Sequence, residues 1–394
     1  MALSISCTAP LVIAFCLTSL AWGSPQQRTF ISKHEVVAPK WGVNLRATLP
    51  SEPLGLIVGH GHETRLKPYT SLWFLDNDTI AVTFITREGE PKLSTQETMN
   101  ANTALRLRLV LFDAENGHIV NTTAWPTETR FAAIRTVYGG RFVTQRGTEL
   151  TLYSLQLREL KRLDLPSAGS DEWYAYPSPS GKSLLFITTN LRTHSSVPWI
   201  WVDTDSLAVV RSWKEVQSGW VGISDRHIAM TKCVWFFDCQ PEVEARSING
   251  DWKAIASADR HNMPHPQFVD DDTVFLLGRP TELVRMDGQI IVTEGVPLEG
   301  CWWGGVVVSS TQRVAVPSCK LKGAMPALDL GGHDVLKKLV LYDAPFRGPS
   351  YVLDLKGPKI NDLTTLAISP DGSRIAILNV EKLTLELVEL PPLQ

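Results

Sequence analysis

The chain has 394 residues, a formal net charge of −3 at pH 7 and 20% charged residues, with both signs interspersed. This balance leaves no basic stripe for nucleic acid and no polybasic patch for an anionic membrane surface, so we expect neither partner. The 25 prolines and 27 glycines, without a long helical pattern, predict many short strands joined by turns.

Residues 1–23 have features of a secretory signal peptide. They contain no Lys, Arg, Asp or Glu, although a positive side chain is usual near the start, and Pro10–Trp22 is mostly apolar. Ala21 and Gly23 are small residues at positions −3 and −1 of the expected cleavage site. The alternative is an uncleaved anchor, but the apolar run is shorter than the roughly 20 residues that span a bilayer. We therefore expect a signal peptide, a lead-in segment over 24–43, and a secreted or periplasmic protein without membrane insertion after cleavage.

A short pattern then recurs seven times: an apolar strand, a tight turn of Asp, Asn, Pro, Ser or Gly, and a second apolar strand. The copies are Leu72–Val82, Ile134–Val143, Tyr176–Ile187, Val221–Met230, Gln267–Leu276, Gly305–Val316 and Leu366–Leu378. They recur at intervals of about 40–60 residues, and a propeller blade has about 40–50. The two longest intervals contain the insertions Arg87–Leu105 and Lys320–Leu336. The spacing predicts an all-β fold, a single seven-bladed β-propeller of four-stranded antiparallel blades over residues 44–394.

The third and fourth strands of a repeat are predicted as hairpins. Asn-Gly and Asp-Gly, which favour tight hairpin turns, join Val110–Asp113 to His118–Thr122 and Glu282–Met286 to Gln289–Thr293. The last repeat stops after its third strand, Leu383–Glu389. We expect the N-terminal segment Asn44–Leu49 to supply the missing strand, because closure removes free sheet edges.

One copy of the pattern carries a family resemblance. Ser369-Pro370-Asp371-Gly372, followed by Arg374, resembles the repeat of bacterial secreted WD40-like, TolB-type and YVTN-type propeller proteins, and Ser178–Lys182 is a weaker copy. The resemblance covers residues 44–390 at the level of pattern. It implies the fold rather than the function, because the motif is turn chemistry. The Gly-His and Trp-Asp signature of eukaryotic WD40 repeats is absent.

Residues just before the first strand of each repeat are predicted to surround one mouth of the central channel. These residues are Tyr69, Arg130, Trp173, Trp220, His265, Trp302 and Asp362. Aromatic rings with a few polar groups suit a sugar ring or an apolar peptide side chain. We expect a non-enzymatic module that binds a glycan or an extracytoplasmic protein segment there, without a cofactor. The structural alternative, for any one tryptophan, is a place in the core between blades.

Four cysteines remain beyond the expected cleavage site. We favour the local pairings Cys233 with Cys239 and Cys301 with Cys319, each within one repeat, among the three pairings that four cysteines allow. A zinc site is the alternative, but the sequence has no C-x2-C element. Disulfides suit an oxidising compartment outside the cytoplasm.

Two other functions stay open. A propeller enzyme, lactonase- or lyase-like, could use a metal at the mouth with Glu172, His265 and Asp362. Gly59–Glu63 (GHGHE) is the most metal-like string, but a third fixed ligand is not identifiable. Asp270–Asp272 lacks the ligand ladder of a calcium loop and is predicted to be a turn. The other open function is a scaffold that works through its blade edges.

Overall fold

The computed structural model describes most of the chain from Ser32 to Gln394, and all of these residues belong to one unit. The described ranges are 32–48, 55–56, 70–87, 104–129, 132–167, 173–188, 196–216, 219–232, 242–257, 265–277, 281–294, 307–310, 312–321, 333–356, 364–379 and 383–394. Within them, no helix is long and apolar enough to cross a membrane. The described residues form β-strands and one helical turn, α1 (Leu45–Thr48).

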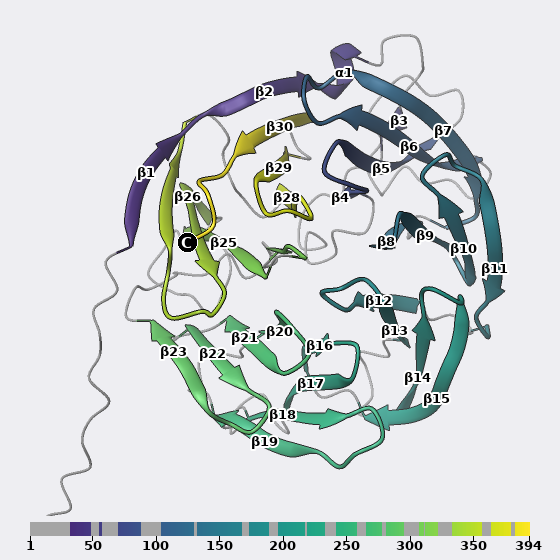
Figure 1. Ribbon diagram of the computed structural model, residues 1–394. Helices are drawn as coiled ribbons and strands as arrows, with labels where there is room; N and C mark the ends of the chain where they lie inside the picture. Colours follow the sequence, from purple (N-terminus) through teal and green to yellow (C-terminus); the bar gives the residue numbers. More distant parts are fainter. Residues whose placement is uncertain are drawn as a thin grey trace, which may run out of the picture. The chain divides into compact units, whose positions relative to one another are not determined.

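Seven sheets surround a common centre, and in each the first strand lies innermost (Figure 1). Blade 1 contains β4 (Thr70–Phe74), β5 (Thr79–Arg87), β6 (Leu105–Asp113) and β7 (Ile119–Thr127), and β3 (Gly55–Leu56) also pairs with β5. Blade 2 contains β8 (Ala133–Tyr138), β9 (Arg141–Arg146), β10 (Glu149–Ser154) and β11 (Glu159–Asp164). Blade 3 contains β12 (Trp173–Pro177), β13 (Ser183–Thr188), β14 (Ser196–Asp203) and β15 (Ala208–Val216).

The remaining blades repeat this order. Blade 4 contains β16 (Val221–Ile223), β17 (His227–Lys232), β18 (Glu242–Ser247) and β19 (Lys253–Ser257). Blade 5 contains β20 (His265–Phe268), β21 (Thr273–Leu277), β22 (Thr281–Arg285) and β23 (Ile290–Glu294). Blade 6 contains β24 (Val307–Val308), β25 (Arg313–Leu321), β26 (His333–Asp343) and β27 (Tyr351–Leu355). Blade 7 contains β28 (Thr364–Ile368), β29 (Arg374–Asn379), β30 (Thr384–Glu389) and, from the N-terminal side, β2 (Pro39–Asn44).

The predicted all-β fold with seven four-stranded antiparallel blades is confirmed. Each predicted repeat forms the first two strands of one blade and the turn between them. The turn residues act as expected: in blade 7, Asp371 Oδ1 accepts hydrogen bonds from the N–H of Ser373 (3.0 Å) and from the hydroxyl of Ser369 (2.6 Å). Gly372 adopts φ +71°, a conformation that glycine tolerates best.

Apolar side chains fill the space between neighbouring blades. Every residue of β13 is buried, because both faces of this second strand pack against a neighbouring blade, whereas β11 at the outer edge is almost entirely exposed. Between blades 2 and 3, for example, Val143 and Leu152 pack with Leu184 and Phe186. The core is therefore a series of layers between blades rather than one central cluster.

The strand that closes the ring precedes the predicted segment. Strand β2 pairs antiparallel with β30, from Pro39 opposite Val388 to Asn44 opposite Thr384. The prediction of Asn44–Leu49 was wrong in position, because residues 45–48 form α1 instead. Trp41 fixes the register of β2 on β30. Its side chain packs against the core between blades 7 and 1 and donates its Nε1–H to the carbonyl of Ala114 (3.0 Å). Strand β2 therefore comes mostly from the expected lead-in segment over 24–43.

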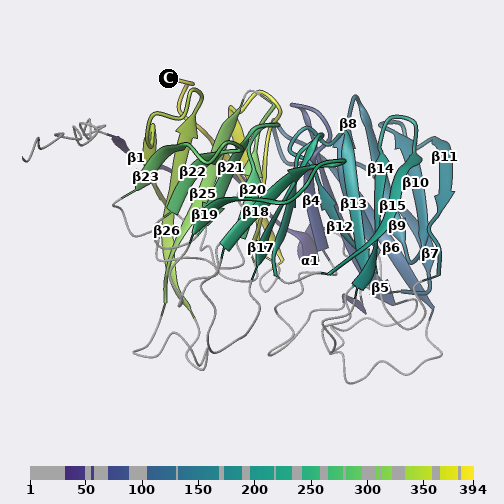
Figure 2. The same cartoon turned by 90° about the horizontal axis from the view of Figure 1, so that it is seen from below.

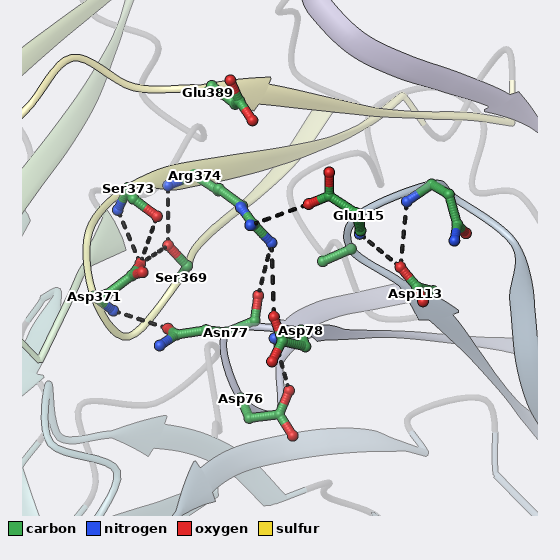
Figure 3. A network of polar contacts seen from close by, with 12 residues as sticks. Asp76, Asn77, Asp78, Asp113, Glu115, Ser369, Asp371, Ser373, Arg374 and Glu389 are labelled. Atoms are coloured by element: carbon green, nitrogen blue, oxygen red, sulfur yellow. Dashed lines mark hydrogen bonds and ion pairs between the residues drawn. The ribbon is translucent and has the colours of Figure 1, made fainter.

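Polar contacts connect the last and first blades (Figure 3), and Lys40 joins the closing strand to both. Arg374 donates to the carbonyl of Asn77 (3.2 Å) and to Glu115 Oε2 (3.3 Å). Lys40 of β2 donates to the other oxygen of Glu115 (2.5 Å) and lies 3.0 Å from Glu389. The ammonium of Lys40 holds the pKa of Glu115 below its usual value. One short network thus joins the strand, blade 7 and blade 1 at the surface.

A buried arginine joins blade 6 to blade 7. The side chain of Arg313 is fully buried and makes two hydrogen bonds to the carboxylate of Asp343, at 2.5 and 2.9 Å. Its remaining N–H groups donate to the carbonyls of Gly372 (2.9 Å), Pro391 (2.6 Å) and Pro392 (3.0 Å). The guanidinium therefore satisfies five acceptors and holds residues 391–392 against the two blades.

Replacement of Arg313 by Ala should destabilise the fold strongly, because the Asp343 carboxylate would stay buried without its charge partner. We expect a loss of about 3–5 kcal/mol in the free energy of unfolding, measured by urea titration. The double variant Arg313→Met with Asp343→Leu should recover part of this loss, because no unpaired charge is left. A loss below about 1 kcal/mol for the single variant would contradict the buried-pair account.

Candidate functional site

The predicted mouth corresponds to one end of every blade. The first strand of a blade begins at the end where its antiparallel second strand finishes, so Trp173 lies opposite Thr188 and His265 lies opposite Leu277. We call this the mouth end, and the opposite end, where the first two strands are joined, the turn end. Figure 2 shows the strands from the side, running between these two ends.

Three of the seven predicted ligand-binding residues lie among the described residues. These are Trp173, Trp220 and His265. The other four, Tyr69, Arg130, Trp302 and Asp362, lie outside them and stay predictions. The same holds for Glu172 and for the Gly59–Glu63 string of the enzyme interpretation.

Trp220 and His265 form a stacked pair at the mouth end. Trp220 directly precedes β16 of blade 4, and His265 is the first residue of β20 in blade 5. Their ring centroids are 3.9 Å apart and the planes are inclined by 26°. Both side chains are only partly buried. The sequence placed each residue at the mouth separately, and the structure brings them into contact.

Close packing of two inner strands accounts for this pair. A Cβ atom at Gly222 of β16 would lie 2.3 Å from the carbonyl oxygen of Pro266 in β20, so a larger residue there would push the strands apart. At Gly219, a Cβ would lie 2.3 Å from the carbonyl of Thr231. The two glycines therefore let the backbone approach closely on either side of Trp220. The stack therefore lies at the start of two inner strands that pack closely.

The environment of His265 keeps its imidazole neutral. Although the residue as a whole is partly exposed, its Nε2 atom is buried, and this burial disfavours the charged form and lowers the pKa of His265 from 6.5 to about 4. At neutral pH the pair therefore presents an uncharged indole and an uncharged imidazole.

Trp173 occupies the core. It is 4% exposed, packs in the layer between blades 2 and 3, and donates its Nε1–H to the carbonyl of Pro166 (2.9 Å). This is the structural alternative that the sequence left open for a single tryptophan. Trp173 supports the mouth end from below rather than offering ring area to a ligand. The sequence could not separate it from Trp220, because both stand at the start of a first strand.

The predicted disulfides fall on parts of the chain that the structure leaves undescribed. Cys233, Cys239 and Cys301 lie outside the described residues. The backbone of Cys319 belongs to β25, and its side chain is not described. Both pairings stay predictions. Among the described residues, no three His, Cys, Asp or Glu side chains gather in a way that could hold a metal ion.

A polar cavity of about 480 Å³ lies at the turn end between blades 5 and 6. It is lined by Asp270, Asp271, Asp272, Thr273, Arg285 and Gln312. Asp270 Oδ1 accepts from the N–H groups of Asp272 (2.8 Å) and Thr273 (2.7 Å), and Asp271 accepts from Arg226 of blade 4 (3.0 Å). These carboxylates therefore serve the turn and the contact between blades, as the turn interpretation expected.

Comparison with known proteins supports the fold. No family model matches the chain, and no curated protein matches it. A chain in the crystal structure of the mitotic checkpoint complex is similar at a TM-score of 0.51 and 10% identity, over 98% of this chain and 100% of that one. The β-propeller domain of the Trilobed protease from Pyrococcus furiosus gives 0.49 and 10%, over 83% and 94%. The C-terminal WD40 domain of Sif2 gives 0.44 and 12%, over 92% and 100%.

The seven blades define the class: the described chain is a seven-bladed β-propeller. At about 10% identity the similarity carries the fold and no specific function. A bacterial or TolB-type origin stays a prediction from the Ser-Pro-Asp-Gly turn. The function must therefore be inferred from the side chains of the candidate site.

His265 predicts a pH dependence of stability. Between pH 6.5 and about 4 the unfolded chain binds a proton at this imidazole that the folded chain excludes. The free energy of unfolding should therefore fall as the pH is lowered through this range, by up to about 1.4 kcal/mol per pH unit from this group. Urea unfolding at pH 7 and pH 5 measures the change.

Three variants separate His265 from other titrating groups. His265→Asn should flatten the pH dependence, and Trp220→Ala should reduce it because the imidazole becomes more exposed. Trp220→Phe keeps a ring over the imidazole and should retain the wild-type slope. An unchanged slope in His265→Asn would show that this histidine is not the responsible group.

Proposed function

We propose that this propeller is a non-enzymatic, extracytoplasmic binding module that recognises a protein segment or a glycan at its mouth end. The observation that carries the proposal is the Trp220–His265 stack, an uncharged and partly exposed aromatic pair at the start of two closely packed inner strands. Binding sites concentrate where a rigid scaffold presents such side chains beside loops. The predicted residues Tyr69, Arg130, Trp302 and Asp362 would extend the surface around the mouth.

The chemistry of the stack suits a ligand with an apolar face. A sugar ring presents C–H groups on one face, and an apolar peptide side chain presents a similar surface, so either can pack on an indole. An anionic ligand would gain no charge attraction from the pair itself, because His265 is neutral at pH 7. Polar or charged neighbours such as Arg130 and Asp362 would then fix the orientation of the ligand.

The location outside the cytoplasm rests on the sequence. The apolar residues 1–23 and the four remaining cysteines support secretion or a periplasmic location. The mass of the N-terminal peptide of the exported protein tests cleavage after Gly23, which predicts a mature chain that begins at Ser24. The mass change on reduction tests the two disulfides.

Binding should depend on the stack and not on the turn end. In isothermal titration against an oligosaccharide panel and an apolar-rich peptide library, a ligand of the wild-type protein should bind Trp220→Ala at least tenfold more weakly, about 1.4 kcal/mol. Arg285→Ala, in the polar cavity at the opposite end, is the control and should bind as the wild type does. The sugar and peptide arms distinguish the two ligand classes.

If the wild type and a folded Trp220→Ala variant bind the ligand equally, the stack is not part of the binding site. A stoichiometric metal ion in the purified protein, with turnover lost on chelation, would instead favour the enzyme interpretation. Thermal unfolding of both variants checks that a loss of affinity is not a loss of fold.

A further inference from the structure

The outer edge of blade 6 carries an additional strand. Strand β1 (Lys33–Val37) pairs in parallel with β27, from Lys33 opposite Tyr351 to Val37 opposite Leu355. Within the part of the chain that the structure describes, the outer strands of the other six blades have no such fifth strand. Figure 1 shows β1 and β2 following one another along the rim, over blades 6 and 7. The edge of blade 6 therefore accepts a strand from outside its own repeat.

Backbone groups hold β1 in place. The N–H of Lys33 donates to the carbonyl of Ser350 (3.2 Å), and the N–H of Lys356 donates to the carbonyl of Val37 (2.7 Å). Between these two ends, the alternation of a parallel ladder turns the N–H of Glu35 toward β27. The N–H groups of His34 and Val36 consequently point away from the sheet.

Side chains of β1 contribute little burial. Four of its five residues are exposed, and Val36 is 60% exposed. Val37 is partly buried against the apolar layer between blades 6 and 7, and the ammonium of Lys33 lies 5.6 Å from the centre of the Tyr351 ring. The strand is therefore held mainly by main-chain bonds, which any copy of the same segment could make.

The link between β1 and β2 is short enough for β1 to change its position while β2 stays in blade 7. Ala38 alone links it to β2, which is anchored in blade 7 by Trp41. Pro39 disfavours a helical conformation at Ala38 and keeps the link extended. A short, extended hinge between a fixed strand and a weakly buried one is the arrangement that favours exchange of strands between copies.

We propose that the edge of blade 6 is a self-association site, at which a second copy of this chain inserts its β1 beside β27. The exchange is reciprocal and gives a closed dimer with two-fold symmetry. Each β1 keeps its register, its hydrogen bonds and the Val37 contact, so only the conformation at Ala38 changes. The surface lies on the rim and is separate from the stack at the mouth end.

The test uses two proline variants that differ by one position. Glu35→Pro removes an N–H that faces β27, whereas Val36→Pro removes one that points away, as edge strands tolerate. Purified wild type and an isotope-labelled copy are mixed at rising concentration and analysed by native mass spectrometry. Light scattering gives the dimer fraction, and thermal unfolding confirms that each variant is folded.

We expect mixed dimers of the wild type and of Val36→Pro, with a fraction that increases with concentration. Glu35→Pro should stay monomeric, with its dimer fraction reduced at least tenfold at equal concentration. A wild type that is monomeric at every concentration would overturn the proposal. Equal dimerisation of Glu35→Pro, or loss of the dimer in a folded Val36→Pro variant, would overturn it as well.

Discussion

The pairing of β2 with β30 is the constraint on which the rest of the structure depends. Blade 7 has only three strands of its own, and β2 completes it. Because β2 precedes blade 1 in the sequence, its pairing with β30 joins the C-terminal blade to the N-terminal part of the unit. Trp41 anchors the strand by packing against the hairpin turn of blade 1. A Cβ at Gly117 in this turn would lie 2.8 Å from the Trp41 ring, so the position favours glycine. Lys40, Glu115 and Arg374 add surface contacts across the same junction. Closure thus couples the first and last repeats, which are far apart in the chain.

A closed ring gives its two ends different roles. At the turn end, successive blades are tied by polar bonds: Ser180 to Asp225 (2.7 Å), the N–H of Asp225 to Asp271 (3.0 Å), and the N–H of Asp371 to Asn77 (3.1 Å). Polar side chains there are used to hold blades together. At the mouth end, the Trp220–His265 stack is partly exposed and lies where two inner strands pack closely. The proposed binding surface therefore lies at the mouth end, and the proposed self-association surface lies on the outer rim.

Local chemistry made the fold predictable, and long-range packing made parts of the site unpredictable. The seven turns could be recognised because Asp, Ser, Pro and Gly act within four residues of one another. The closing strand was misplaced because residues 39–44 and 44–49 both alternate apolar and polar side chains. Only the contact of Trp41 with blade 1 chooses between them. Trp173 and Trp220 occupy equivalent repeat positions, and their burial depends on neighbouring blades. Arg313 gave no signal, because an arginine that begins a strand is usually exposed.

Amide hydrogen exchange of the wild type and of a Trp41→Ala variant tests the dependence on closure most directly. If β2 holds the ring, the variant should lose protection in β28–β30 and β4 together, because blade 7 opens and blade 1 loses its neighbour. Trp252→Ala, a partly buried tryptophan packed between blades 3 and 4, should leave these strands protected. Loss of protection limited to β2, with β28–β30 and β4 unchanged, would contradict the account.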